Sequence, residues 1–499
     1  MGEHKSQRIP DPLFVVLLFL AFSLLYALFT PVWETPDEPA HYLRIRKLAE
    51  GDDFDRPRYP GPFRTVWSEF YLYSSYQASQ PPLYYLAAGA TLKGLNLVLP
   101  PPSGRIIFPP VRADRETAGK VFLHPELPRR ALLSGAASVY CLRFFSVFLG
   151  GLTVILIYKI ARTAWPGEPT VALGAAGFAA TLPQFNFISG AIGNDPAAAL
   201  LGAGTLLYLV SRLSRDRPAG ARYYLGLGAL LALGLLVKLN LVFLLPTAVV
   251  FILLKRIPLP LPPPPGGEGV TWCGKPPSGR VASAGNRPGG DKAVGRGAAS
   301  GFPPGWRGTA AALLLTFAPL FLIGAASALL FPGEFAWKVR VLRARLFQFT
   351  PEMLTGVEFR HMFGAIYRSF FALFGWMSIP VSGWLYLAWG LLGAFALAGW
   401  FRRPSGRIGR RGVSLGRPGG LLAAAAVILL VGVIKNNLLV PQSQGRFLFP
   451  ALGAIAALFS AGFCRHFPRA LRRRAVRTLL VLLAVLNLIA FFEFLGRIS

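Results

Sequence analysis

Long apolar segments constrain the fold of this chain more than any other feature, because few soluble domains contain so many runs of bilayer-crossing length. A transmembrane helix needs about 20 mostly apolar residues. Ten-residue stretches of alternating polarity, which a membrane β-barrel requires, are absent. We therefore predict an all-α, polytopic bundle of about 11 transmembrane helices. The predicted spans are 12–30, 143–162, 169–188, 196–212, 223–237, 239–254, 309–330, 380–400, 419–438, 447–463 and 477–495.

The composition is that of a membrane protein and argues against a nucleic-acid-binding protein. Hydrophobic residues make up 53% of the chain and charged residues 15%, which is unusual for a soluble domain. The formal net charge of +30 is a property shared with nucleic-acid-binding proteins. Here the basic residues cluster at the ends of predicted spans, and no nucleic-acid-binding motif accompanies them. We therefore expect membrane lipids, and no nucleic acid, among the partners.

The basic clusters also predict an orientation. If the N-terminus is cytoplasmic, the main clusters all fall on the cytoplasmic side, as the positive-inside rule requires. Residues 31–142, 331–379 and 442–446 then lie outside the cytoplasm, which predicts a multi-pass protein of the plasma or inner membrane. The clusters are Lys5 and Arg8; Lys159 and Arg162; Arg212 to Arg222; Lys255 and Arg256; Arg402 to Arg411; and Arg465 to Arg477.

Two further segments set the organisation. Residues 81–99 are apolar, but a full crossing there would invert every later span against the charge rule, so we predict an interfacial or re-entrant helix. Residues 257–308 are rich in Pro, Gly and Arg and lack apolar periodicity, which predicts a flexible cytoplasmic linker. The linker divides an N-terminal module, 1–256, from a C-terminal module, 309–499.

Two adjacent carboxylates, Asp37 and Glu38, follow the first span within the sequence Pro-Asp-Glu-Pro-Ala-His. Acidic residues are concentrated in 30–78 of a chain that has few elsewhere. Residues 40–49 have the pattern of a short amphipathic helix, which holds the carboxylates at a fixed depth. On position alone, a site and an ordinary solvated loop are both open.

Several cations and polar residues lie at the same predicted membrane face. Arg143 and Arg446 each begin an apolar helix, where a guanidinium is best matched by a carboxylate or a phosphate, although a snorkelling arginine is the simpler alternative. Lys238 interrupts an apolar stretch and marks a short outer turn. Asn194 and Asp195 precede a proline, so capping of the next helix is the favoured interpretation.

Taken in order, these residues resemble the N-terminal half of GT-C membrane glycosyltransferases, which include protein O-mannosyltransferases and the bacterial enzymes that transfer aminoarabinose onto lipid A. The likeness covers most of residues 12–255. The C-terminal half looks more like an uncharacterised bacterial branch that carries the Pro-Asp-Glu-Pro-Ala-His pattern. The motifs are Asp37-Glu38 with His41, Pro81-Pro82-Leu83-Tyr84-Tyr85, Arg143-Phe144-Phe145-Ser146, Leu182-Pro183, Asn194-Asp195, Lys238, Phe374-Gly375-Trp376 with Pro380, and Gln444-Gly445-Arg446-Phe447-Leu448-Phe449-Pro450.

The resemblance implies an enzyme that moves a sugar from a polyprenyl-phosphate carrier to an acceptor glycan, lipid or protein outside the cytoplasm. A sugar hydroxyl is a poor nucleophile, so a carboxylate has to accept its proton, and Asp37 is the candidate base. Glu38 either raises the proton affinity of the pair or binds acceptor hydroxyls or a metal. No cofactor is implied with certainty, and a divalent cation stays open. The implied substrate-binding residues are His41, Tyr84, Arg143, Asn194, Asp195, Lys238, Gln444 and Arg446.

Other function classes remain open at this point. A lipid flippase or transporter also has many helices and buried charges, but its polar residues are expected near the bilayer midplane in paired broken helices. A glycan polymerase or ligase shares the lipid-linked substrates but usually builds its site from a large loop late in the chain. A non-catalytic membrane protein gives no reason for the acidic first loop.

Overall fold

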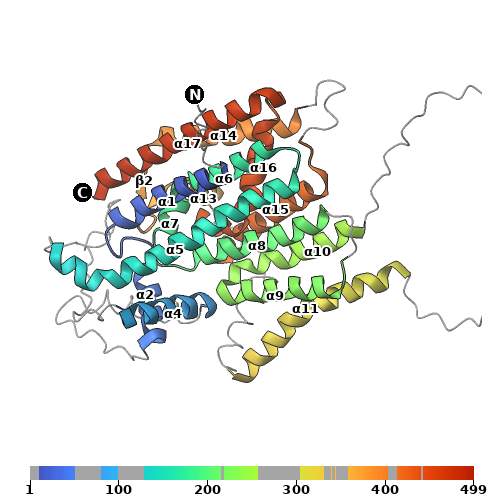
Figure 1. Cartoon of the computed structure of the whole chain (residues 1–499), viewed down its shortest axis with the longest axis horizontal. Helices are drawn as coiled ribbons and strands as arrows, with labels where there is room; N and C mark the ends of the chain where they lie inside the picture. The colour runs from blue at the N-terminus through green and yellow to red at the C-terminus, as the bar shows by residue number, and fades with distance from the viewer. Residues whose placement is uncertain are drawn as a thin grey trace, which may run out of the picture.

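The computed structural model describes residues 11–50, 80–98, 129–214, 219–256, 304–330, 339, 343, 358–402, 413–439 and 442–498. These residues form a helical bundle with one two-stranded antiparallel ribbon, which confirms the all-α class (Figure 1). The elements are α1 (Asp11–Phe29), α2 (Glu38–Glu50), α4 (Leu83–Val98), α5 (Arg129–Ala164), α6 (Pro169–Ala180), α7 (Pro183–Ser189), α8 (Asp195–Leu213), α9 (Ala221–Val237), η1 (Leu239–Phe243), α10 (Leu244–Arg256), α11 (Pro304–Leu330), α13 (Phe359–Phe371), β1 (Leu373–Phe374), β2 (Ile379–Pro380), α14 (Gly383–Phe401), α15 (Gly416–Leu439), η4 (Gly445–Ala451), α16 (Leu452–Cys464) and α17 (Arg469–Ile498).

Within the described residues, eight helical segments are long and apolar enough to cross a membrane: α1, α5, α8, α11, α14, α15, η4 with α16, and α17. The helices α6 and α7 form a ninth such segment if the pair, which is bent by 61°, counts as one span. The other two predicted spans, 223–237 and 239–254, correspond to the shorter helices α9 and η1–α10. The chain is a multi-pass membrane protein, and the predicted number of about eleven spans is not established.

Helices from both halves of the chain pack in a single bundle. α5 lies against α1, α6 and α8, while α16 and α17 from the second half pack on α6. Small residues allow the closest approach: a Cβ on Gly202 of α8 would collide with the carbonyl oxygen of Pro450 in η4. The predicted linker, 257–308, lies outside the described residues up to residue 303, and α11 begins at Pro304.

The break between α6 and α7 is stabilised by two side-chain amides. Asn186 donates to the carbonyl oxygens of Ala180 and Leu182, at 3.0 Å each, and Asn487 of α17 donates to that of Thr181 at 3.1 Å. A bend in an apolar helix frees backbone carbonyls that lipid cannot bind, so buried amides have to satisfy them. The bend turns the chain, so that the residues after α7 run towards α2.

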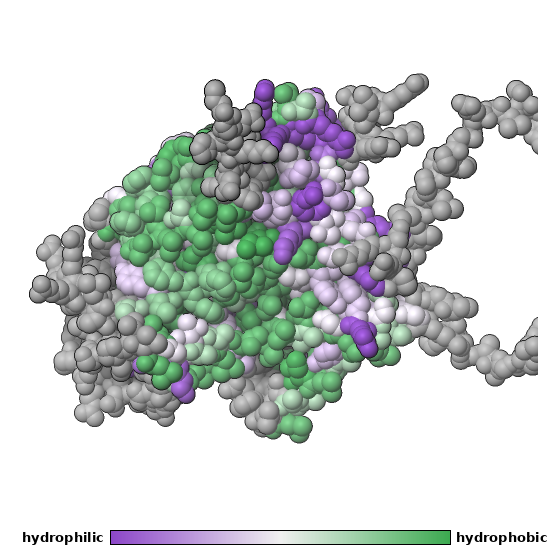
Figure 2. All heavy atoms as spheres, viewed as in Figure 1, coloured by the Kyte–Doolittle hydropathy of each residue, from purple (hydrophilic) through white to green (hydrophobic). Residues whose placement is uncertain are grey.

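The two ends of the bundle differ in chemistry. At one end, here called the basic end, hydrogen bonds join the predicted cytoplasmic clusters: Lys255 to the carbonyl of Arg212, Arg465 to those of Arg402 and Val413, and Arg469 to Glu168. At the opposite end, here called the α2 end, lie α2, α4, η1 and η4. Figure 2 shows hydrophilic residues gathered on the right, where α10 ends in Figure 1, beside a broad hydrophobic surface.

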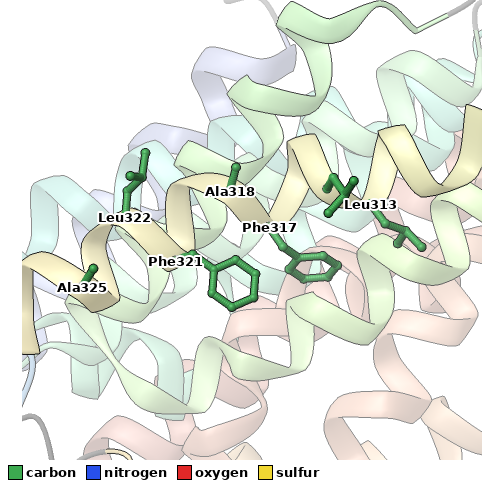
Figure 3. Close-up of a pocket in the computed structure, with 7 residues that line it drawn as sticks. Leu313, Phe317, Ala318, Phe321, Leu322 and Ala325 are labelled. Atoms are coloured by element: carbon green, nitrogen blue, oxygen red, sulfur yellow. The ribbon is translucent and has the colours of Figure 1, made fainter.

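One pocket lies on the outer surface of α11, and Figure 3 shows its lining. Its lining includes no titratable side chain, and the Phe321 side chain is 75% exposed. A surface of this kind on a span is suited to contact with lipid chains, so we do not assign the pocket to the chemistry of the protein. The lining residues are Leu313, Leu314, Phe317, Ala318, Phe321, Leu322 and Ala325.

Candidate active site

Glu38 and Arg143 form a fully buried, bidentate ion pair at the α2 end. Nε and Nη2 of Arg143 each donate to a carboxylate oxygen of Glu38 at 2.7 Å. The remaining donors of Arg143 bind the carbonyl oxygens of Ala27, Thr30 and Pro31, where α1 ends. All five guanidinium N–H groups are therefore used. No N–H group of Arg143 therefore remains for the phosphate contact that the sequence suggested.

The Glu38 carboxylate also organises the loop before α2. It accepts hydrogen bonds from the Thr35 hydroxyl at 2.8 Å, the Trp33 amide at 3.1 Å and the Ile192 amide at 3.2 Å. With the two bonds from Arg143, its lone pairs are occupied. Glu38 therefore joins α1, α2, α5 and the segment after α7.

Two non-glycine residues in this loop adopt left-handed backbone conformations, Trp33 with φ of 76° and Asp37 with φ of 64°. Such a conformation is unfavourable for a bulky side chain and easier for Asp. The Trp33 carbonyl accepts a hydrogen bond from the indole of Trp376 at 2.9 Å, which holds the loop from its other side. The turn at Asp37 directs its side chain away from Glu38's partners.

Asp37 belongs to a second charged network. Its carboxylate accepts a hydrogen bond from Nη2 of Arg446 at 2.7 Å, and Nη1 of Arg446 lies 3.5 Å from Asp195. Asp195 in turn binds Nζ of Lys238 at 2.5 Å. Two carboxylates and two cations thus alternate, and the Asp37 side chain, 16% exposed, is the most accessible of the four.

The Phe447 ring supports both cations of this network. The Lys238 ammonium and the Arg446 guanidinium each lie 5.6 Å from the ring centroid, which is within cation–π range. Nε of Arg446 donates to the Gln444 amide oxygen at 2.6 Å. The guanidinium therefore has a fixed plane, because carboxylate, amide and ring contacts restrain it together.

The segment that carries Arg446 is seated on α13 by Gly445. The Gly445 amide donates to the Ser369 hydroxyl at 2.7 Å. A Cβ on Gly445 would collide with the Ile366 carbonyl and lie only 2.6 Å from Cα of Phe370. Glycine is required here because the two backbones touch.

Replacing Gly445 with alanine is expected to reduce activity far more than stability. The added methyl group meets backbone atoms that cannot rotate away, so the segment has to shift and Arg446 leaves its position. A misplacement of about 1 Å costs on the order of 10²-fold in rate. The activity and the melting temperature of the protein are to be compared with those of Gly432→Ala, where a Cβ meets nothing within 4 Å. Equal activity in the two variants contradicts the expectation.

The residues after α7 bring backbone amides into the site. The Gly193 amide donates to the Tyr84 hydroxyl at 3.0 Å, which links this segment to α4. Asn194 precedes α8, but its side chain makes no capping hydrogen bond; its amide lies 3.5 Å from the Val237 carbonyl. Capping was the favoured interpretation of Asn194 and Asp195, and it is wrong in both cases. Neither side chain caps α8, because Val237 and Lys238 offer partners across the helix packing.

His41 lies on the first turns of α2 in a buried environment. Its Nδ1 is 2.8 Å from the Tyr85 hydroxyl. Burial lowers the pKa of the His41 imidazole from 6.5 to about 4; the carboxylate of Asp37 opposes this shift, and the positive charge of Lys238 adds to it. The imidazole is therefore neutral at pH 7 and able to accept or donate one hydrogen bond at each nitrogen.

This buried imidazole predicts a pH dependence of stability. Above pH 6.5 His41 is neutral in both the folded and the unfolded chain and contributes nothing. Between pH 6.5 and 4 the unfolded chain binds a proton that the folded chain does not. The free energy of unfolding therefore decreases as the pH is lowered, by up to about 1.4 kcal/mol per pH unit. We expect the melting temperature of His41→Gln, measured from pH 8 to about 4.5, to fall less steeply than that of the wild type. Parallel profiles contradict this assignment.

The structure brings all ten sequence-predicted residues to the α2 end, in the two networks and the adjoining His41, Tyr84 and Asn194. Sequence reasoning gave Tyr85 and Phe447 no role of their own, although both lie in the motifs it quoted, and it missed Ser369. Phe447 had a local signal, since it follows Arg446 directly. Ser369 had none, because its partner is 76 residues away. Among the described residues no group of three or more His, Cys, Asp or Glu side chains is placed to hold a metal ion.

The arrangement is that of a site at one end of the helical bundle, with a partly exposed carboxylate and two cations. The family model for dolichyl-phosphate-mannose-protein mannosyltransferases matches residues 131–261. This similarity supports a glycosyltransferase of the membrane-embedded type at the level of the family. The matched stretch contains Arg143, Asn194, Asp195 and Lys238, but neither Asp37 and Glu38 nor Arg446. A comparison with curated proteins gives no match.

Proposed function

We propose that this protein is a membrane glycosyltransferase of GT-C type that transfers a sugar from a polyprenyl-phosphate-linked donor to an acceptor hydroxyl. The observation that carries the proposal is the placement of Asp37: a carboxylate on a left-handed turn, partly exposed at the end of an apolar bundle, within one network with Arg446, Asp195 and Lys238. The family similarity supports the same class of reaction.

Asp37 is assigned the role of general base. As the acceptor oxygen attacks the anomeric carbon, its proton passes to the Asp37 carboxylate, the bond between that carbon and the phosphate oxygen breaks, and polyprenyl phosphate leaves with the electron pair. A positioned base contributes about 10²- to 10⁴-fold to such a step. Glu38 and Arg143 are assigned to positioning, because their hydrogen-bonding groups already bind each other and the loop.

Lys238 and Arg446 are assigned to the donor phosphate. In the structure their charges are balanced by Asp195 and Asp37. A donor phosphate that binds Arg446 competes with Asp37 for the same guanidinium. The Asp37 carboxylate then loses that hydrogen bond, and its oxygen is open to the acceptor hydroxyl. Donor binding is thus expected to prepare the base for the acceptor.

The sidedness of the site follows from the basic end. If the arginine-rich end of the bundle faces the cytoplasm, as the positive-inside rule requires, the α2 end faces the outside. The donor then approaches from the bilayer and the acceptor from the water beyond it. Location in the plasma or inner membrane, with a cytoplasmic N-terminus, is part of this proposal.

The proposal is tested by sugar transfer in membranes. Membranes that contain the protein are incubated with a panel of radiolabelled polyprenyl-phosphate sugars, and with the matching nucleotide sugars as the control donor. We expect label in an envelope glycan, lipid or protein only with lipid-linked donors and only when the protein is present. Failure of every lipid-linked sugar in the panel removes the proposed donor class.

One observation favours a transporter as the second candidate. The bent pair α6–α7 is a broken helix, a feature that transporters use at their binding sites. Within the described part of the chain there is one such pair, whereas transporters built from repeats have two. Reconstituted vesicles separate the candidates, because a flippase moves a fluorescent lipid-linked sugar across the bilayer without an acceptor.

A further inference from the structure

Asn240 is a side chain whose burial the packing does not explain. It lies in η1, two residues after Lys238. Both its amide nitrogen and its amide oxygen are shielded from solvent, and neither has a hydrogen-bond partner. Among the described residues, no other side-chain amide leaves both its nitrogen and its oxygen unpaired.

The position of η1 places this amide beside the charged network. η1 follows Lys238 directly and packs against η4, which carries Arg446, and against α15. Lys238 and Arg446 also meet on the Phe447 ring. Asn240 therefore lies two residues from Lys238, in an element that packs on the one that carries Arg446.

An unpaired amide in an apolar bundle is unfavourable. Water is excluded from the amide, and lipid offers no hydrogen bonds, so the cost of removing the amide from water is not recovered. The neighbouring Lys238 shows that this region does pair its polar groups, since its ammonium binds Asp195 at 2.5 Å. A polar group left unpaired next to a binding site is best explained by a ligand that supplies the partner.

The chemistry of the amide distinguishes between parts of a lipid-linked sugar. A phosphate diester offers acceptors only, and a polyprenyl tail offers neither donors nor acceptors. A sugar hydroxyl both donates and accepts, so neighbouring hydroxyls match the paired donor and acceptor of one amide. The unpaired groups of Asn240 fit the sugar rather than the rest of the donor.

We propose that Asn240 binds hydroxyl groups of the donor sugar, beside the cations that hold its phosphate, and so contributes to the choice of sugar. This inference rests on the proposed function. Because both atoms are shielded from solvent, the amide reaches the sugar through rotation of its side chain or displacement of its cover as the donor binds. Replacement by leucine, of similar volume, then removes the cost of an unpaired amide from the protein alone and a sugar contact from the complex.

The test measures ligand-induced thermal stabilisation of the full chain in lipid nanodiscs. The probes are a polyprenyl monophosphate and the same lipid carrying one of a panel of sugars, including mannose and aminoarabinose. The variants are Asn240→Leu, Asn240→Gln and the wild type. The matched control is Thr309→Val, which removes another unpaired buried polar atom, in α11 and far along the chain from the site.

The expected result has two parts. Without ligand, Asn240→Leu and Thr309→Val are at least as stable as the wild type. With a preferred sugar lipid, the wild type and Thr309→Val bind more tightly than they bind the bare phosphate, whereas Asn240→Leu loses about tenfold in affinity for the sugar lipid alone. Asn240→Gln keeps the amide but moves it one methylene further out. Its affinity for the sugar lipid is expected to lie between those of the wild type and Asn240→Leu.

The outcomes separate the two claims. If the wild type prefers a sugar lipid and Asn240→Leu retains the full preference, Asn240 does not contact the sugar, while the proposed donor class stands. If the wild type binds no sugar lipid in the panel more tightly than the bare phosphate, the inference about Asn240 is overturned. If it binds no polyprenyl phosphate at all, the proposed function is overturned as well. A misfolded Asn240→Leu leaves Asn240→Gln to give the same comparison.

Discussion

Replacement of Asp37 by asparagine is expected to lower the rate of sugar transfer by about 10²- to 10⁴-fold while the protein still folds. The fold survives because asparagine tolerates the left-handed backbone conformation of this position and its amide oxygen still accepts a hydrogen bond from Arg446. Activity is lost because an amide cannot take the proton of the acceptor hydroxyl. The measurement is initial transfer rate per amount of folded protein in membranes.

Two comparisons make this expectation specific. Glu358→Gln neutralises another carboxylate near α13, 75% exposed and paired with His361, and is expected to leave the rate unchanged. Donor binding to Asp37→Asn is expected to be kept or strengthened, because Arg446 loses a competing charge. A rate equal to that of the wild type would falsify the role of Asp37 as base.

Replacement of Arg143 by methionine is expected to produce the largest loss of stability. The change leaves the Glu38 carboxylate, fully buried, without its cation, and frees the three carbonyl oxygens at the end of α1. Breaking one partner of a buried ion pair costs about 3–5 kcal/mol. Melting temperature and yield of monodisperse protein in detergent are the measurements. Arg143→Lys is expected to restore little of the lost stability, because an ammonium cannot reproduce the bidentate contact with Glu38.

The cause of this loss is open to a direct check. Glu38→Gln combined with Arg143→Met removes both charges, so the double variant is expected to be more stable than Arg143→Met alone. The carbonyl oxygens of Ala27, Thr30 and Pro31 stay unpaired, so the recovery is expected to be partial. If the stability loss of the double variant equals the sum of the losses of Glu38→Gln and Arg143→Met, the ion-pair explanation is contradicted.

Sequence reasoning singled out the residues of the candidate site because they lie within or at the ends of apolar segments, where a charge is costly and therefore noticeable. Asp37 follows the first span, Lys238 interrupts an apolar stretch and Arg446 precedes one, and the structure brings the three together. The pairing itself had no local signal. The sequence predicted that Arg143 and Arg446 each begin an apolar helix, but Arg143 lies within α5. Its guanidinium is closed by Glu38 and backbone carbonyls, while that of Arg446 binds the carboxylate we assign as the base. Only the tertiary packing decides which guanidinium remains able to bind a ligand.

The bend between α6 and α7 could not be predicted from local sequence either. The run 169–188 was predicted as one span, whereas the structure bends it by 61° between α6 and α7. Pro183 marks the bend, but a proline is also tolerated within a continuous transmembrane helix when neighbours satisfy the freed carbonyls. Here the neighbours are Asn186 and Asn487, and the second is 306 residues from the carbonyl that it binds. A hydrogen bond between residues so far apart cannot be predicted from the local sequence around the bend.

The bond between Asp37 and Arg446 joins residues 409 positions apart. The carboxylate is synthesised after the first span, and its cation arrives only when most of the chain has left the ribosome. A nascent chain therefore carries an unmatched acid at the membrane face throughout elongation, and any truncation before residue 446 yields an incomplete centre. In the proposed function, a partial product of translation therefore lacks the cation assigned to the donor phosphate.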